Sequence, residues 1–477
     1  MTRHGFGLLL AACVLLCAGC LMGPDYRRPR FDLPPGASDN DSAQYAPFTA
    51  ADWWRLFDDP VLDRIEAEAL ASNRDLMIAA ARVEEARALA RVALADRLPA
   101  IGISAAGGRE RTTLQAAPPA GSRTVDFFEA FGYASFELDF WGLYRRLDEA
   151  ARAELLSSEA GRDAVRLSLT ADVAALYFNL RTLEAQTRIA REQLATYDAT
   201  CELYRKRYRF GYTQELDLRR IEADRLATEA LVYRRENALS QAGTALAVLL
   251  GRGPRDIVQG FAEEGRPLED LNAAPRIPDN IPSGLLERRP DIRREEGLLI
   301  AANARIGAAR AALFPAIRLT AQSGFSSPEL EDLFSKDAQA WNMAAGLVQP
   351  VFEGGRLLAL EKAARARHKQ RLARYEQTVQ NAFRETRDSL VAGTKTAQAL
   401  EVSLQRAQAM RRALELSQKQ HAGGYISIID VLDIQRRSLL AELDLSVARQ
   451  ERLDALIALC RSMGGGWQES TDAARVY

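Results

Sequence analysis

The chain has 477 residues and carries 63 basic against 64 acidic ones, a balance that gives no reason to expect a nucleic-acid partner. Hydrophobic residues make up 47% but aromatic residues only 7%, so the apolar content is mostly Ala and Leu, which suits long packed helices better than a β-rich core. After the first two dozen residues no apolar run approaches the roughly 20 residues of a transmembrane helix. Any crossing of a bilayer by the mature chain must therefore use strands.

The sequence contains an internal duplication. The segment ADRLPAI at 95–101 recurs 216 residues later as AALFPAI at 311–317. The segment RFGY at 209–212 recurs 213 residues later as AGGY at 422–425. Two distant markers that keep nearly the same offset indicate a unit of roughly 200 residues duplicated end to end.

The N-terminus is predicted to be a signal peptide over residues 1–19. Arg3 and His4 precede a short apolar stretch, which ends in the lipobox-like segment LCAGC at 16–20. Cys20 is therefore predicted to be lipidated, with a diacylglyceryl group on its sulfur and an acyl group on its nitrogen, and Leu21 favours delivery to the outer membrane. The alternative is an ordinary secretory signal with incidental cysteines, since Cys17 stands where an aliphatic residue is usual.

The first repeat is predicted to follow an extended, Pro- and Gly-rich segment over residues 20–55 and to span 56–250. A helix is expected from about Val61 to Arg97, and residues 107–130, rich in Gly, Pro, Thr and Ser, read as a loop. The remaining expected elements are strands at ~98–107 and ~131–141, a long helix at ~143–209 and a return helix at ~215–250. Apolar residues from Leu176 to Tyr208 alternate in steps of four and three, which is the heptad seam of a coiled coil.

The second repeat is predicted over 285–467, after a Pro-rich linker at 251–284 and before a C-terminal tail at 468–477. A helix over about 285–313 opens it. The expected elements that follow are strands at ~315–325 and ~341–352, a long helix at ~356–420 and a return helix at ~426–463. The long helices would each reach roughly 100 Å, more than a compact domain needs.

Two strands in each repeat give four in the chain, too few to close a barrel. An open sheet edge cannot lie in lipid, because its backbone groups would go unpaired. The strands must therefore be pooled between copies of the chain, eight in a dimer or twelve in a trimer, with the helices forming a second, coiled-coil cylinder. Cys201 and Cys460 are not expected to pair, because their distances from the turns place them at heights differing by about 40 Å.

Five motifs resemble the lipoprotein branch of the outer membrane factors, the channels similar to TolC and OprM. They are CLMGPDY at 20–26 with Pro29, LDFWG at 138–142, QPVFEGGR at 349–356, IDVLD at 429–433 and MGGGW at 463–467. The resemblance covers essentially all of residues 20–467. It implies a homotrimer with a twelve-stranded outer-membrane β-barrel, a periplasmic α-helical barrel and an equatorial belt, working with a periplasmic adaptor protein and an inner-membrane pump.

The resemblance also points to the periplasmic tip, whose turns are marked by Gly211, Gly423 and Gly424. Ile429, Asp430 and Asp433 lie within one helical turn after the second tip, and they match a constricting apolar residue and two constricting carboxylates of the family. Three copies would place a ring of carboxylates around a narrow axis, which favours cations. The alternative is that Asp430 only caps the returning helix.

The tip departs from the family at one position. Ile426 stands where some members carry a latching Arg, so any latch must use other groups, such as Arg436 or Arg437.

The function expected is that of a passive outer-membrane exit channel for small compounds in a tripartite efflux system. The alternatives are a type I secretion or metal-efflux conduit of the same fold, or a structural outer-membrane lipoprotein. No catalytic or metal-binding constellation appears among the three histidines and five cysteines, so no enzyme activity, metal or cofactor beyond the acyl groups is expected. The lack of a Met- or His-rich tract favours organic compounds over metal ions.

Overall fold

The structure is a computed structural model that describes residues 21–31, 42–112, 123–261, 265–271, 277–278 and 288–466. It divides into two compact units. The first takes Met1–Arg30, Val83–Ser158 and Arg294–Glu376, and the second takes Phe31–Arg82, Glu159–Arg293 and Gln377–Tyr477. Cys20 and the C-terminal tail lie outside the described residues.

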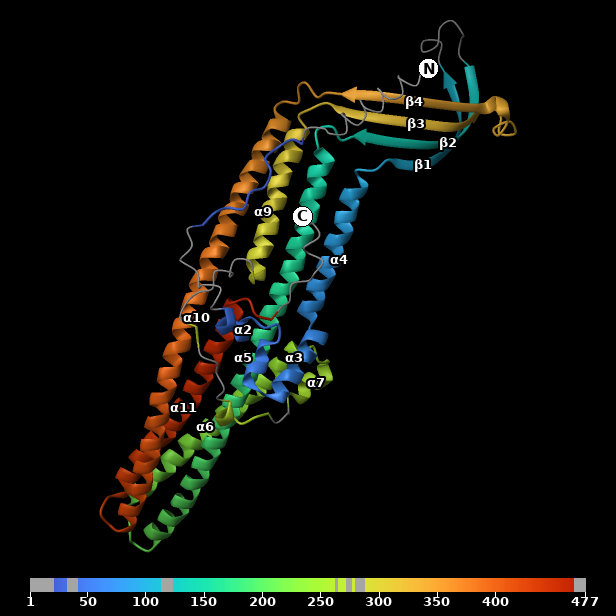
Figure 1. Cartoon of the computed structure of the whole chain (residues 1–477). Helices are drawn as coiled ribbons and strands as arrows, with labels where there is room; N and C mark the ends of the chain where they lie inside the picture. Colours follow the sequence, from blue (N-terminus) through green and yellow to red (C-terminus); the bar gives the residue numbers. More distant parts are fainter. Residues whose placement is uncertain are drawn as a thin grey trace. The chain divides into compact units, whose positions relative to one another are not determined.

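Long helices dominate both units (Figure 1). The helices are α2 (Ser42–Thr49), α3 (Pro60–Ser72), α4 (Arg74–Ala95), α5 (Leu143–Arg209), α6 (Glu215–Leu249), α7 (Pro254–Gln259), α9 (Pro290–Ala311), α10 (Arg356–Ala422) and α11 (Ile428–Ser462). Short 3-10 turns are η2 (Trp53–Phe57), η3 (Leu268–Asp270) and η4 (Lys336–Ala338). None of the helices within the described ranges combines the length and the hydropathy needed to cross a bilayer.

The first unit contains one antiparallel sheet in the order β1-β2-β3-β4 (Figure 1). Its strands are β1 (Ala100–Thr112), β2 (Arg123–Leu138), β3 (Ala316–Ser327) and β4 (Gln339–Val348). The central pairing of β2 with β3 joins the two halves of the duplicated sequence. Within the described residues, the outer edges of β1 and β4 have no strand partner.

The two faces of this sheet differ in polarity. Residues directly opposite one another on paired strands share a face, and one face carries Ile101 and Ile103 of β1 together with Met343 and Trp341 of β4. These four side chains are at least 73% exposed. The other face carries mostly small and polar residues, among them Ser104, Glu137, Arg318, Gln322 and Asn342. One apolar and one polar face are typical of strands that separate lipid from water.

The first two strands are longer than the sequence predicted. β1 runs to Thr112 and β2 begins at Arg123, in a stretch whose Gly and Ser content had favoured a loop. Cross-strand pairs explain the difference. Phe127 lies opposite Gly108, and the Arg109 guanidinium donates to the carboxylate of Asp126, with Nε 2.6 Å from Oδ1. An aromatic ring over a glycine and an opposed ion pair both favour strand pairing, so composition alone misled here.

The duplication is visible element by element. α5 and α10 each contain 67 residues and begin 213 positions apart, as do α6 and α11 with 35 residues each. α4 and α9 each contain 22 residues and begin 216 positions apart. Strand pairing follows the same offsets, since Ala100 opposite Ser135 recurs as Ala316 opposite Val348. The offset changes only between β1 and β2.

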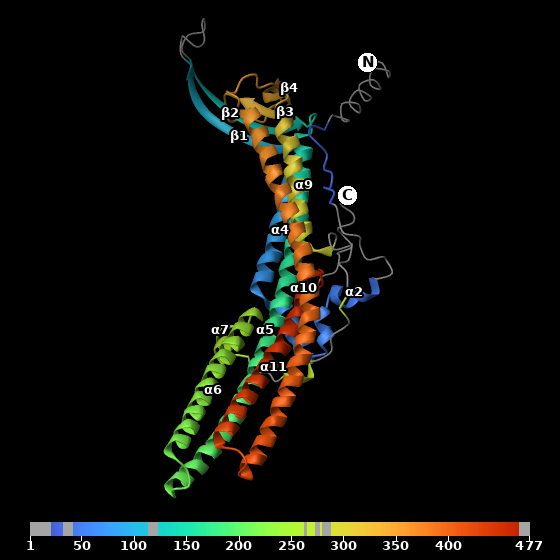
Figure 2. The ribbon, with the colours of Figure 1, turned by 90° about the vertical axis from the view of Figure 1, so that its left-hand side faces the viewer.

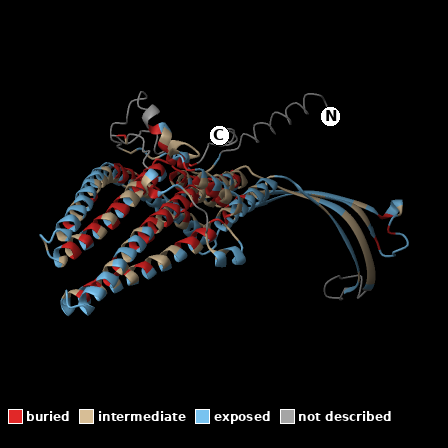
Figure 3. Ribbon diagram, turned by 90° about the horizontal axis from the view of Figure 1, so that it is seen from below, coloured by how far each residue is buried: buried red, intermediate tan, exposed pale blue. Residues whose placement is uncertain are grey.

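The core of the second unit forms where α5 packs against η2, α3 and α11. Phe178 and Phe57 approach edge to face at 4.7 Å between ring centres, and the Tyr177 hydroxyl donates to Asp59 at 2.6 Å. Figure 3 shows stretches of buried residues along these helices, whereas the strands of the first unit are mostly exposed or intermediate. Cys201 and Cys460 are both buried and free, as the helix lengths had predicted.

The helix expected from Val61 to Arg97 is broken at Asn73. Asn73 adopts an extended conformation, its side-chain oxygen accepts from the Leu76 amide at 3.0 Å, and its side-chain nitrogen donates to the Leu249 carbonyl at 2.8 Å. An asparagine that bonds neighbouring backbone groups competes with the helix, and here it starts a new one.

Candidate functional site at the hairpin tips

Two helical hairpins of the second unit, α5–α6 and α10–α11, end in similar turns on the same side of the unit (Figure 2). Gly211 and Gly424, which are 213 residues apart, adopt φ of 77° and 78°. In both turns the glycine amide and the following tyrosine amide return to carbonyls of the last helical turn, as in the bonds from Gly424 to His421 and from Tyr425 to Gln420. A left-handed residue is needed there, which explains glycine at both positions. Gly423 does not share this conformation.

Asp430 takes part in a capping box at the start of α11. The Ser427 hydroxyl accepts from the Asp430 amide at 3.3 Å, and the Asp430 carboxylate accepts from the Ser427 amide at 3.1 Å and the Ser427 hydroxyl at 2.7 Å. These partners are neutral, so the exposed carboxylate keeps its charge. The arrangement gives the capping alternative direct geometric support, and it leaves Asp430 available for a second role.

Asp433 lies one turn further along α11 and is paired within its own helix. Its carboxylate contacts Arg436 at 3.1 Å and Arg437 at 2.8 Å, with all three side chains partly exposed. Ile429, between the cap and this pair, is 45% exposed. Arg436 and Arg437, which the sequence offered as a latch, thus hold Asp433, and the charge at Asp433 is less available to passing ions than that at Asp430.

The first hairpin lacks this arrangement. With the 213-residue offset, Asp430 corresponds to Asp217 and Asp433 corresponds to Arg220. Gln214, the counterpart of Ser427, makes no side-chain cap bond. The two tips therefore differ in charge, and the carboxylate pair belongs to the second hairpin.

His421, at the end of α10, joins the two hairpins. Its Nδ1 lies 3.0 Å from the Ile426 carbonyl, and its Nε2 lies 3.0 Å from the Tyr204 hydroxyl of α5. Because a carbonyl can only accept, Nδ1 carries the proton and donates, and Nε2 of the neutral ring accepts from Tyr204. Burial raises the pKa of Tyr204, so its hydroxyl stays protonated and can donate.

An apolar cluster surrounds this contact. Tyr197, Cys201 and Tyr204 of α5 pack with residues of α6 and with Leu432 of α11. The His421 bridge was not foreseen from the sequence, which placed His421 and Tyr204 on separate heptad seams. The available signal was their position, since both side chains lie within two helical turns of a tip glycine.

In the first unit, the segment that follows Cys20 is held at the end of the sheet. The Met22 amide donates to the Trp141 carbonyl at 3.1 Å, and buried Arg146 of α5 donates to the Met22 carbonyl and to Asp25. Trp141, just beyond β2, stacks on Phe314 with ring centres 4.6 Å apart. Aromatic rings at strand ends are typical of a membrane interface, and Cys20 is two residues from this contact.

Among the described residues, no group of three or more His, Cys, Asp or Glu side chains could hold a metal ion.

A sheet with one exposed apolar face and two open edges, together with two long helical hairpins that end in polar tips, defines a channel-forming protein of the outer membrane. The chain matches the family described as "Outer membrane efflux protein" over residues 67–252 and 281–465, one stretch in each repeat. It therefore belongs to the outer membrane efflux protein family.

Individual relatives agree over nearly the full length. The toluene efflux pump outer membrane protein TtgC of Pseudomonas putida is 32% identical, with 98% of this chain and 97% of TtgC covered. The cation efflux system protein CusC of Escherichia coli O6:H1 is 34% identical, with 97% and 99% covered. The structure of the outer-membrane channel OprN superposes with a TM-score of 0.85 at 29% identity, covering 94% of this chain and all of that one.

These likenesses confirm the resemblance to outer membrane factors that the sequence motifs predicted. The fold class is confirmed as well: two tandem repeats of strands and long coiled-coil helices, the fold of trimeric outer-membrane channels. The chain is an exit channel of an efflux system, and its location is the outer membrane.

Proposed function

We propose that three copies of this chain form the exit channel and that it conducts passively, without catalysing a reaction. The four-stranded sheet carries this proposal, because its exposed apolar face requires lipid and its two open edges require partners. Three copies supply twelve strands, enough to close a barrel. A periplasmic adaptor and an inner-membrane pump would deliver the exported compound to the hairpin tips.

Small organic compounds are the substrate class that we propose. The relative TtgC, a toluene pump component, supports this class, whereas CusC, a cation system component, keeps metal ions as the alternative. A deletion strain that carries the chain with its own adaptor and pump separates the two. Restored growth on organic solvents and dyes supports the proposal, and restored growth on copper or silver alone supports the alternative.

The duplication predicts the register between copies. The pairing of β2 with β3 inside one chain corresponds to the pairing of β4 with β1 of the next copy. Tyr133, the counterpart of Gly346, lies opposite Gln322, the counterpart of Ala106. Gly346 of one copy should therefore lie opposite Ala106 of the next. This register also keeps the apolar face continuous across the junction.

We expect the double variant Ala106→Cys with Gly346→Cys to form covalent trimers under oxidising conditions, visible on a non-reducing gel. Directly opposed residues fall within the roughly 4–7 Å that a disulfide allows. The space around Gly346 is open, so a cysteine fits there. Within one chain β1 and β4 are three strand spacings apart, about 14 Å, so an internal disulfide is excluded.

The matched control is Ser104→Cys with Gly346→Cys, which uses the same face and edges but a register shifted by two residues. It should cross-link far less. Native mass measurement of the uncrosslinked protein should give a trimer. A stable monomer, or equal cross-linking of both pairs, would contradict the proposed closure.

We also propose that Cys20 carries the lipid anchor. Cys20→Ser should abolish labelling by a radioactive fatty acid and weaken membrane attachment, although a closed barrel would still hold the protein in the membrane. Cys17→Ser is the matched control, because Cys17 belongs to the signal peptide, and it should keep the label. Label that survives in the Cys20 variant would contradict the lipobox interpretation.

Finally, we propose that Ile429, Asp430 and Asp433 line the periplasmic constriction and that the bridge from His421 to Tyr204 latches it. Their support is their position at the tip of one hairpin, the charge that Asp430 retains and the contact between the two hairpins. The tests of both roles are given in the Discussion.

A further inference from the structure

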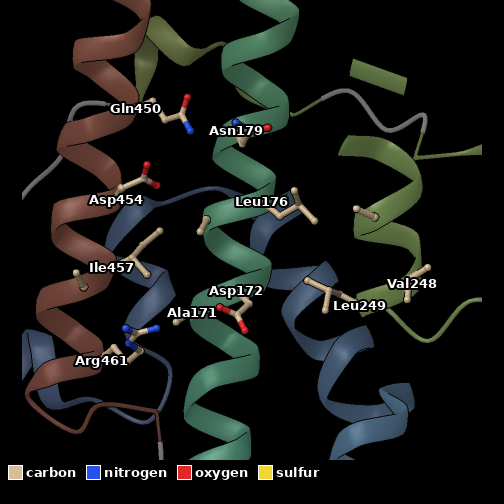
Figure 4. A pocket seen from close by; sticks show the side chains of 13 residues that line it. Ala171, Asp172, Leu176, Asn179, Val248, Leu249, Gln450, Asp454, Ile457 and Arg461 are labelled. Carbon is tan, nitrogen blue, oxygen red and sulfur yellow. The ribbon is translucent and has the colours of Figure 1, made fainter. Parts of the chain in front are cut away.

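A groove of about 790 Å³ runs between α5, α6 and α11 in the second unit (Figure 4). Its volume lies within the range typical of small-molecule sites. Its walls are mainly apolar and include Leu176, Leu249 and Ile457. None of the contacts that place Asp430, Asp433 and His421 at the tip involves this groove.

The groove lies on the side of α5 that faces away from the core. Tyr177 and Phe178 of α5 point into η2 and α3, whereas Asp172, Leu176 and Asn179 line the groove. A tunnel wall one helix thick has two faces, and the elements η2 and α3 cover one of them. In the channel proposed above, the groove therefore opens onto the conduit.

The polar side chains in the groove leave an excess of negative charge. Asp172 and Asp454 face it together with one cation, Arg461. In Figure 4, Asp172 and Arg461 lie toward one end, and Asp454, Gln450 and Asn179 lie toward the other. Arg461 lowers the pKa of Asp172 and so offsets part of the burial that raises it. The carboxylate of Asp454 has one buried oxygen, Oδ1, without a hydrogen-bond partner.

We propose that this groove binds amphiphilic organic cations, with the apolar body of the ligand against Leu176, Leu249 and Ile457 and its positive charge at Asp454. This inference rests on the proposed function and names a substrate class for it. A cation supplies the partner that the buried carboxylate oxygen lacks, and the apolar walls favour a ligand with a hydrocarbon body over a hydrated metal ion.

The experiment measures binding of ethidium, a flat organic monocation, to the purified trimer by fluorescence anisotropy. Asp454→Asn keeps the shape of the side chain and removes its charge, and it should weaken binding about tenfold, given the strength of a partly buried charge pair. Arg461→Gln removes the opposing charge and should tighten binding. Ala175→Trp fills the groove and should abolish saturable binding.

The matched control is Asp444→Asn on the same helix. Asp444 is exposed, pairs with Arg406 and does not line the groove, so ethidium binding should be unchanged. Burial disfavours the charged form of Asp454, and Asp454→Asn should therefore unfold no earlier than the wild type. Thermal unfolding of each variant separates loss of the site from loss of the fold.

The binding should also depend on pH. Burial raises the pKa of Asp454 to about 6, with Glu451 on the same helix contributing in the same direction. The other charged groups facing the groove are Asp172 of α5 and Arg461 of α11, and the α6 lining is apolar. The carboxylate attracts a cation only when deprotonated, so affinity should fall as the pH drops through about 6. Asp454→Asn should show no such fall.

Unchanged ethidium affinity in Asp454→Asn, or a wild-type trimer without saturable binding, overturns this inference. Planar-bilayer conductance of the wild type distinguishes that failure from a failure of the channel proposal. A trimer that conducts but does not bind ethidium loses the groove inference alone, whereas one that does not conduct loses the proposed function.

Discussion

Replacing Asp430 and Asp433 together by alanine is expected to lower the cation preference of the channel several-fold in planar bilayers. The change removes two carboxylates from each of three copies, at a constriction where little water screens them. A unit charge 4 Å from a permeating ion contributes about 1 kcal/mol even in bulk water. Block by multivalent cations should weaken for the same reason, and high salt should reduce the difference from wild type.

The capping box allows the charge of Asp430 to be separated from its structural role. Asp430→Asn keeps an oxygen that can accept from Ser427 but removes the charge, so it should lower selectivity without lowering the melting temperature. Asp430→Ala removes both, and loss of the cap should also cost about 1 kcal/mol of stability. If alanine lowers only the melting temperature and asparagine changes nothing, Asp430 is a cap and not part of a gate.

Tyr204→Phe is expected to raise the conductance of the closed channel by shifting it toward open states. The constriction can widen only if the α10–α11 hairpin moves away from α5–α6, and the hydrogen bond from Tyr204 to His421 resists that movement. A hydrogen bond of this kind contributes about 1 kcal/mol, which corresponds to about a fivefold shift in the ratio of open to closed channels.

Tyr208→Phe is the matched control for the latch. Tyr208 lies one turn further along α5, is 43% exposed and stands outside the apolar cluster around Tyr204. The same loss of a hydroxyl there should leave conductance unchanged. Equal conductance of Tyr204→Phe and wild type in single-channel recordings would remove His421 and Tyr204 from the gate.

The sequence predicted the helical part of the fold closely because its signals are local. An uninterrupted heptad pattern indicated one helix over ~143–209, and the structure has α5 over Leu143–Arg209. Most seam positions, from Leu180 to Tyr204, are buried or partly buried, but Tyr208 at the frayed end is exposed. The strand ends were less well predicted, because pairing such as Phe127 opposite Gly108 depends on a partner and not on composition.

The site was predicted in part for the same reason. The spacing of Asp430 and Asp433 shows in the sequence that they can share a helix face. The partners that modify them do not show, because Ser427 bonds Asp430 through its backbone and side chain and Arg437 reaches Asp433 through a rotamer choice. The bridge from His421 to Tyr204 joins residues 217 positions apart and needs the packing of two hairpins.

The equal lengths of the paired helices restrict how the tunnel can change in evolution. A change of seven residues in α5 alone would move its tip by about 10 Å and separate Tyr204 from His421. The turn would leave its neighbour, and a ring of six hairpins would no longer end in one plane for an adaptor to meet. Length can therefore vary only when α5, α6, α10 and α11 change together by the same number of heptads. The loop between β1 and β2, where the two repeats already differ by three residues, is free of that restriction.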